Sequence, residues 1–144
     1  HASLAELAEE KEDKYDPIIS NPPFYSEDYK TTDESRDVAR FNDALPFDEL
    51  IESASLLLSD EGVFAVIIPR KEEERFIKIA SEVNLFPNRI CRVRGNETSE
   101  EKRSMLEFSF EKISPKIENL IIETSRHNYT EEYKKLVGDF YLKM

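Results

Sequence analysis

An unbroken run of apolar and mostly β-branched residues from Val63 to Ile68 sets the strongest limit on what this chain can fold into. Such a run is typical of a strand that is buried on both faces, in a sheet with helices on each side. Apolar residues at helical spacing flank the run, and they predict one helix from residue 45 to a turn at 60–62 and another over 71–84. This alternation of helix and strand predicts an α/β fold.

Shorter patterns complete the expected sheet. Residues 17–20 are a brief apolar run that predicts a buried strand, and Pro17 suits the first position of that strand because proline cannot donate to a ladder. Residues 90–94 predict another short strand. The strict alternation of apolar and polar residues over 106–111 predicts an antiparallel strand with one solvated face. The sheet is therefore expected to end in an antiparallel pair.

Capping signals predict where the remaining elements begin. Thr98 and Glu101 are three residues apart and predict a capping box for one helical turn. A last short strand is expected over 120–122, and Asn128 with Glu131 predicts the start of a terminal helix. All of residues 1–144 are expected to belong to a single domain.

The composition argues against several functional classes. Three glycines, Gly62, Gly95 and Gly138, lie too far apart to form a phosphate-binding loop. A single cysteine excludes a disulfide framework and a cysteine-rich zinc site, and it fits a reducing compartment, the cytoplasm. A net charge of −11 argues against broad nucleic-acid binding, and no apolar run approaches the roughly 20 residues of a membrane helix. We therefore expect a soluble protein without a metal.

The residues expected to carry chemistry follow the first strand, at Asn21-Pro22-Pro23-Phe24. Open α/β sheets bind ligands at the carboxyl ends of their strands. Two prolines form a stiff turn, and a residue before proline is extended, so Asn21 is expected to project beside the Pro22 carbonyl. Their two oxygens can accept both hydrogens of one NH₂ group, and Phe24 offers a flat face to a planar substrate. The motif predicts a site that activates a conjugated amine or amide nitrogen by positioning.

Residues 15–24, Tyr-Asp-Pro-Ile-Ile-Ser-Asn-Pro-Pro-Phe, resemble the Asn-Pro-Pro-(Phe/Tyr) motif of class I S-adenosylmethionine-dependent amino methyltransferases. Residues 36–41, 128–133 and 140–142 are similar to one branch of them, the bacterial enzymes that methylate N6 of the adenine beside the anticodon of valine tRNA. The resemblance implies a Rossmann-like, three-layer αβα sandwich. Residues 1–144 are expected to be its carboxyl-terminal half, with the terminal antiparallel strand pair.

The same resemblance implies roles for individual residues. Asn21, Pro22, Pro23 and Phe24 are the implied catalytic residues, and Ser20 and Asn21 contact the methyl donor. The residues implied to meet the tRNA are Phe24, Tyr25, Lys30, Arg36 and Arg40.

The family's Gly-rich strand and loop have no counterpart in this sequence, and this difference also carries expectations. S-adenosyl-L-methionine is expected to be held mainly by an upstream half, and residues 1–144 alone are expected to be inactive. A strand edge near Ile18 would then be open to pairing with a second copy.

Other interpretations stay open. The motif also fits a protein glutamine N5-methyltransferase, and the chain also fits a non-catalytic RNA-binding module. Residues 25–41 either contact the substrate or form a solvated connection. Cys91 is expected to be a buried packing residue, and His127 is expected in a turn. Four arginines either extend an RNA-binding track or form the charged face of an edge strand: Arg89, Arg92, Arg94 and Arg103.

Overall fold

The structure is a computed structural model and describes residues 6–8, 14–23 and 46–140. Its centre is a five-stranded mixed sheet in the order β1-β2-β4-β3-β5. The strands are β1 (Tyr15–Ser20), β2 (Leu58–Pro69), β3 (Phe86–Arg94), β4 (Glu101–Ser109) and β5 (Lys116–Ile121). β1 is parallel to β2 and β3 is parallel to β5, whereas β4 is antiparallel to both of its neighbours. The expected antiparallel pair is confirmed as β3 and β4.

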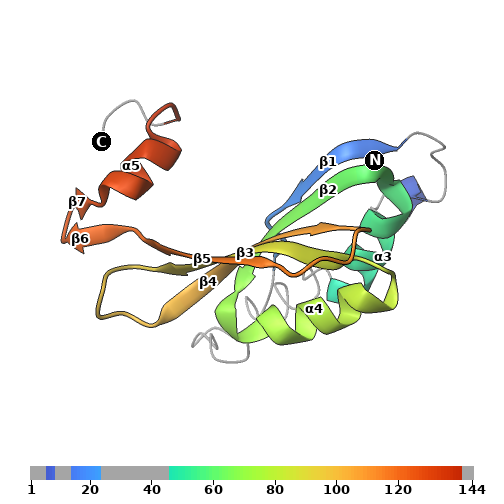
Figure 1. Cartoon of the computed structure of the whole chain (residues 1–144), viewed down its shortest axis with the longest axis horizontal. Coiled ribbons are helices and arrows are strands. Elements are labelled where there is room, and N and C mark those ends of the chain that lie inside the picture. The colour runs from blue at the N-terminus through green and yellow to red at the C-terminus, as the bar shows by residue number, and fades with distance from the viewer. Residues whose placement is uncertain (1–5, 9–13, 24–45, 141–144) are drawn as a thin grey trace, which may run out of the picture.

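Two helices lie together on one side of this sheet (Figure 1). They are α3 (Phe47–Leu57) and α4 (Glu73–Glu82), the latter preceded by a 3₁₀ turn, η2 (Arg70–Glu72). The helix predicted from residue 45 is confirmed, but its predicted end at 60–62 is wrong, because β2 begins directly at Leu58. Leu58 is buried in the core, and a Cβ added at Gly62 would lie 2.7 Å from Cδ1 of Leu58. Glycine therefore suits a position inside the strand here, where Leu58 leaves no room for a side chain.

The core lies between the sheet and these two helices, and phenylalanines dominate it. Phe64 of β2, Phe108 of β4 and Phe76 of α4 are fully buried. The ring of Phe76 meets Phe47 edge-on at 5.0 Å between centroids and lies 5.6 Å from Phe108. Full burial of one such side chain stabilises a fold by roughly 1.5–3 kcal/mol. The aromatic contacts therefore hold α3 and α4 to the same face of the sheet.

The other face of the sheet is less buried than the sequence predicts. Phe64, Val66 and Ile68 point into the core, but Val63 on the opposite face of β2 is 41% exposed. The expectation that this strand is buried on both faces is wrong for the part of the chain that the structure describes. The described helices α3 and α4 both pack on the one side.

The first strand is present but differs from its prediction. It runs from Tyr15, so Pro17 is its third residue, and Ile19 is 82% exposed, which contradicts a buried strand. Within the described residues β1 pairs only with β2, so it is an edge strand. Proline is tolerated in an edge strand because one side of the strand has no neighbour that would need its N–H as a hydrogen-bond donor.

The chain ends in a smaller unit beyond β5. It consists of the two-stranded pair β6 (Glu123–Ser125) and β7 (Asn128–Tyr129), followed by α5 (Glu131–Val137). Figure 1 shows this unit at the same end of the molecule as the hairpin that joins β3 to β4. His127 lies in the β6–β7 turn with a φ of 67°, so its predicted place in a turn is confirmed.

Both predicted capping sites are wrong. Residues 95–100 form a turn, not a helix, because Asn96 Oδ1 accepts hydrogen bonds from the amides of Thr98 (3.1 Å) and Ser99 (2.9 Å). An asparagine that bonds its own backbone in this way closes a tight turn. The cap of α5 is Thr130, whose Oγ1 accepts from the Tyr133 amide at 3.2 Å, whereas Asn128 belongs to β7.

Candidate active site

The Asn-Pro-Pro motif lies where β1 leaves the sheet. Strands β1, β2, β3 and β5 end at one edge of the sheet and β4 begins there; we call this the carboxyl edge. Ser20 pairs with Val66, so Asn21 is the first residue beyond the ladder. Pro22 is buried while Asn21 and Pro23 are exposed, so the turn is anchored by one proline and presents the asparagine to solvent. The implied substrate residues Phe24, Tyr25, Lys30, Arg36 and Arg40 lie outside the described residues.

Asn21 borders a cavity of about 600 Å³ on the face opposite α3 and α4. Ile67, Met105 and Cys91 lie side by side on β2, β4 and β3 and line its centre, and Leu136 of α5 lines it from the terminal unit. Its volume is in the range of small-molecule sites, which runs from roughly 300 to 1,000 Å³. The structure therefore brings Ser20 and Asn21 to the border of a largely apolar hollow.

Arg89, Glu107 and Glu118 border the same cavity, and Lys116 lies next to Glu118. Arg89 Nη1 lies 3.1 Å from Glu107 Oε1, its Nε donates to Glu118, and Lys116 Nζ lies 2.9 Å from Glu118. The hydrogen bonds from Arg89 and Lys116 hold the pKa of Glu118 below its usual value. Burial, and then the charge of Glu118, raise the pKa of the Cys91 thiol. Cys91 is thus a buried, protonated packing residue, as predicted, and it is unsuited to act as a thiolate nucleophile.

A second polar cluster lies on the helix side of the carboxyl edge, around Glu73. This side chain is almost fully buried, and it accepts from Arg92 Nη2 at 2.8 Å and from the Ser104 hydroxyl. Arg70 joins it to Glu101, with Nε 3.0 Å from Oε2 of Glu101. Burial alone would raise the pKa of Glu73, but the bonds from Arg92 and Ser104 and the nearby positive charges outweigh it and lower that pKa.

The sequence analysis placed Glu73 in the first turn of a helix and did not predict that its side chain is buried and ion-paired. The spacing indicates this burial, because Glu73 shares a helix face with the buried Phe76 and Ala80, three and seven residues later. An acidic residue within a buried stripe needs a partner, and the structure supplies one from β3.

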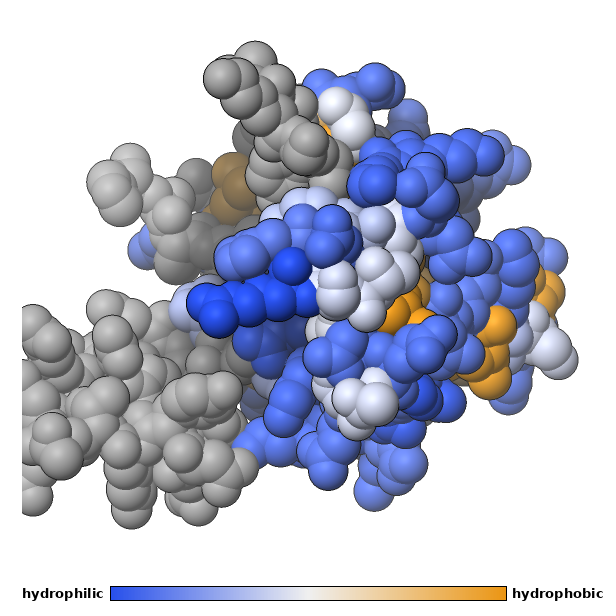
Figure 2. Space-filling model, turned by 90° about the vertical axis from the view of Figure 1, so that its left-hand side faces the viewer, coloured by the Kyte–Doolittle hydropathy of each residue, from blue (hydrophilic) through white to orange (hydrophobic). Residues whose placement is uncertain are grey.

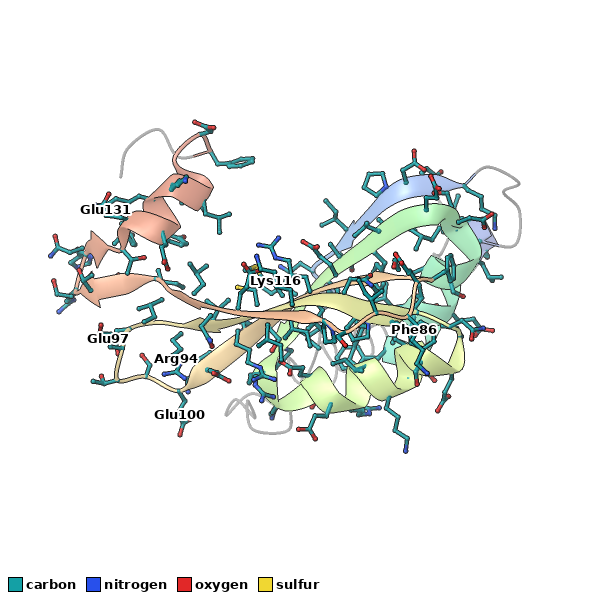
Figure 3. The ribbon with its side chains drawn as sticks, in the orientation of Figure 1. Phe86, Arg94, Glu97, Glu100, Lys116 and Glu131 are labelled. Carbon is teal, nitrogen blue, oxygen red and sulfur yellow. The ribbon has the colours of Figure 1, made fainter. Side chains whose placement is uncertain are left out.

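The arginines of β3 are engaged in ion pairs. Arg89, Arg92 and Arg94 each bond a glutamate, and Arg94 Nη2 lies 3.1 Å from Oε1 of Glu101. Strand β3 lies between β4 and β5, so the interpretation of these arginines as the face of an edge strand is wrong. Figure 3 labels Arg94, Glu97 and Glu100 along the β3–β4 hairpin. Contact of these arginines with RNA stays a prediction.

Three broader features of the described residues complete the description of the molecule. None of their helices is long and apolar enough to cross a membrane, and no three or more of their His, Cys, Asp and Glu side chains gather as a metal site would require. The end of the molecule that carries α5 is mostly hydrophilic with small apolar areas (Figure 2).

Solved structures with a similar fold are methyltransferases. A predicted O-methyltransferase from Agrobacterium tumefaciens matches with a TM-score of 0.52 at 18% identity, over 64% of this chain and 45% of that one. M1.HpyAVI, solved as a complex with SAM, matches with a TM-score of 0.51 at 12% identity, over 83% of this chain and 65% of that one. The mixed α/β sheet of this chain thus matches the fold of these methyltransferases, as expected. Of the two helical layers in the expected αβα sandwich, the described helices α3 and α4 form one.

Curated relatives indicate one group within the methyltransferases. Proteins named tRNA1(Val) (adenine(37)-N6)-methyltransferase match at 58% identity in Flavobacterium psychrophilum and at 57% in Flavobacterium johnsoniae, both over the whole of this chain. A protein of the same name in Bacteroides fragilis matches at 44% identity over 91% of the chain and 55% of its own length. The chain is a homologue of these tRNA1(Val) methyltransferases, which confirms the resemblance. It spans 62% of the length of the two Flavobacterium relatives. No family model matches it.

Proposed function

We propose that this chain is the amine-binding part of an RNA methyltransferase that modifies N6 of an adenine in tRNA. The name of its relatives indicates adenine 37 of valine tRNA as the substrate. The observation that carries the proposal is the identity of 58% over the entire chain, together with Asn21 at the carboxyl edge beside a cavity. The proposed substrate places the protein in the cytoplasm.

In this proposal the chain's own residues hold and orient the amine. The Asn21 side-chain oxygen and the Pro22 carbonyl accept its two hydrogens, which turns the nitrogen lone pair out of the ring plane. Pro23 stiffens the turn, so little reorganisation is needed. Phe24 stacks on the base once it has been extruded from the RNA.

S-adenosylmethionine, when bound, supplies the methyl group. It would act on the amine nitrogen that Asn21 and Pro22 orient, and the proton displaced from that nitrogen would pass to solvent. Among the described residues only Ser20 and Asn21 are proposed to face the donor, since the three glycines of the chain form no phosphate- or nucleotide-cradling loop. We therefore propose that most of the donor site belongs to the rest of a longer polypeptide, and that residues 1–144 are its carboxyl-terminal part.

The relatives' names favour RNA over a protein glutamine as the substrate, and they favour an enzyme over a binding module. The test uses the complete polypeptide with a valine tRNA transcript and, separately, a glutamine-containing release-factor peptide. We expect methyl groups to be incorporated into the tRNA, but not into a transcript with guanine at position 37. Methylation of the peptide alone would overturn the proposal.

The role of Asn21 is tested in the same assay. Asn21→Ala is expected to lower kcat by about 100-fold or more, the scale seen when a hydrogen-bonding group that acts in the transition state is removed. Because Asn21 is exposed, its loss should leave the thermal midpoint unchanged. Asn88→Ala, which removes a hydrogen bond to the Glu111 carbonyl at the opposite end of β3, is the matched control and should retain activity. Full activity of Asn21→Ala would contradict the mechanism.

A further inference from the structure

The polar cluster around Glu73 contains more arginines than carboxylates. Glu101, at the start of β4, accepts from Arg70 Nε at 3.0 Å and from Arg94 Nη2 at 3.1 Å, so two guanidinium groups share one carboxylate. Arg92, the third arginine, is bound by Glu73 at 2.8 Å. Three arginines therefore face two carboxylates, and the cluster keeps one positive charge at the carboxyl edge.

Arg94 has unused hydrogen-bond donors within this cluster. Its bond to Glu101 uses Nη2, while its Nε is shielded from solvent and has no acceptor among the described residues. The Arg94 side chain is nevertheless 38% exposed, so part of the guanidinium faces solvent. A guanidinium carries five N–H donors in a planar fork that fits the oxygens of a phosphate. Arg94 can therefore bind an anion without giving up Glu101.

The structure separates Arg94 from the other two arginines of β3. Arg92 donates from both Nε and Nη2 to the buried Glu73. Arg89 bonds Glu107 and Glu118 beside the cavity, on the opposite face of the sheet. Neither of them can turn to a ligand without leaving a glutamate unpaired. Among the arginines of this strand, Arg94 is thus the one best placed to contact RNA.

The segment that forms the cluster is basic, although the whole chain is acidic. Residues 70–103 hold nine Lys and Arg against seven Asp and Glu, whereas the chain has 20 against 31. Lys102, next to Glu101, is 71% exposed, and its Nζ lies 4.0 Å from the carboxylate of Glu100, which is 90% exposed. An ion pair between two such exposed side chains is weak, so Lys102 adds a cation that remains available to a ligand.

The cluster lies at the same edge of the sheet as Asn21. Ser20 and Ile90 are on one row across β1, β2, β4 and β3, and Arg94 follows Ile90 by four residues. With strands about 4.8 Å apart and a rise of about 3.3 Å per residue, Asn21 and Arg94 are roughly 15–20 Å apart along the sheet. A base that is extruded into a site at Asn21 leaves the adjoining nucleotides outside that site. Their phosphates can then reach Arg94.

We propose that Arg94 and Arg70, bridged by Glu101, bind a backbone phosphate of the RNA substrate, with Lys102 beside them. The inference rests on the proposed function in taking tRNA as the substrate, and it assigns to that function a binding surface on the helix side of the carboxyl edge. The phosphate oxygens accept charge-assisted hydrogen bonds from the exposed part of the Arg94 fork. A contact of this kind fixes the position of the RNA and reads no base. These arginines thus orient the RNA and take no part in the methyl transfer.

The salt dependence of tRNA affinity tests the phosphate contact. Arg94→Gln is made in the complete polypeptide, and binding of a valine tRNA transcript is measured by filter binding from about 50 to about 200 mM salt. We expect binding to weaken about 10-fold and the slope of log K against log salt to decrease by about 0.7–0.9, the contribution of one phosphate. Lys78→Gln removes one positive charge from the exposed side of α4 and is the matched control, which should keep the slope unchanged. Equal slopes for Arg94→Gln and Lys78→Gln would overturn the proposal.

A conservative variant separates the phosphate contact from a structural role of the ion pair. Arg94→Lys keeps the charge and should restore the salt slope, although it lacks the planar fork. A slope as low in Arg94→Lys as in Arg94→Gln would contradict the proposal. Arg70→Gln repeats the measurement at the second arginine and covers the case in which Arg94→Gln does not fold. An unchanged slope in Arg70→Gln would then overturn the proposal.

Turnover provides an independent readout. A phosphate contact binds the ground state and the transition state alike, so Arg94→Gln should raise the KM for tRNA about 10-fold and leave kcat unchanged. It should also weaken the binding of transcripts with adenine or guanine at position 37 by the same factor. A lower kcat with an unchanged KM would contradict the proposal.

Two outcomes distinguish this inference from the proposed function. Methylation of tRNA by the unchanged protein, with no effect of Arg94→Gln on the salt slope, would uphold the proposed function and reject the phosphate site. A reduced slope for Arg94→Gln in a protein that binds tRNA without methylating it would uphold the phosphate site and reject the proposed function.

Discussion

Arg92 and Glu73 form an ion pair that joins β3 to the first turn of α4, with Nη2 of the arginine 2.8 Å from Oε1 of the glutamate. Glu73 is 2% exposed, and Ser104, which pairs with Arg92 across β3 and β4, donates to the same carboxylate. A buried carboxylate is tolerated only when it is paired and hydrogen-bonded. The pair therefore fixes α4 against the sheet just below the carboxyl edge.

Removing Glu73 should destabilise the chain strongly. Glu73→Ala leaves the half-buried Arg92 without its partner, and such a loss costs about 3 kcal/mol. Urea unfolding followed by circular dichroism measures the change. Glu74→Ala, at the exposed neighbouring position, is the control and should stay within about 0.5 kcal/mol of the unchanged chain. A similar stability for the two variants would show that the pair contributes little.

The lowered pKa of Glu73 predicts how stability depends on pH. In the folded chain this pKa lies below its ordinary value of 4.5, so the stabilisation is complete above that value and is lost as pH falls through the folded pKa. The difference in unfolding free energy between the chain and Glu73→Gln should therefore be constant from about pH 7 to about pH 5 and shrink at lower pH. A difference that stays constant down to about pH 3 would exclude Glu73 as its source.

Phe76 should be the most costly side chain of α4 to truncate. It is fully buried against Phe47, Phe64 and Phe108, so Phe76→Ala leaves a cavity and should cost about 4 kcal/mol. Such a loss is a large part of the roughly 5–15 kcal/mol that stabilises a typical domain. Ile19→Ala, at an exposed position, provides the comparison in denaturant unfolding and should cost less than about 1 kcal/mol.

Thr130 should control the start of α5. Its Oγ1 accepts from the Tyr133 amide and donates to the Ile121 carbonyl at 2.6 Å, so Thr130→Val keeps the shape and removes both bonds. The expected cost is about 1 kcal/mol, confined to the terminal unit. Hydrogen exchange should become faster at the amides of residues 133–137 and remain unchanged in β2 and β4. Thr124→Val, near the β6–β7 turn, is the control for the loss of a hydroxyl group and should leave exchange at residues 133–137 unchanged. Faster exchange at those residues in the control would contradict the role of Thr130 as the cap of α5.

The elements that could be predicted from sequence are those with strong local signals. Helices α3 and α4 have apolar residues at helical spacing, and β2 has an apolar run, so each appears near its predicted place. The position of Asn21 after β1 was predictable for the same reason, because a strand followed by two prolines must end there. The ends of the elements were less predictable, because contacts with other segments decide them. Helix α3 ends where Leu58 begins a strand, and the cap of α5 is Thr130 and not Asn128.

By itself, the sequence determined the kind and order of the main helices and strands and the rigid turn at Asn21, because periodicity and proline act within a few residues. Only the tertiary structure decided that Ile67, Met105 and Cys91 share the sheet face opposite α3 and α4 and that Arg92 meets Glu73, since each joins segments far apart in the chain. Strand register assigns a side chain to one face or the other, and one residue of slip would reverse that assignment. For that reason the apolar composition of β2 was visible in the sequence, whereas which side of β2 is covered was not.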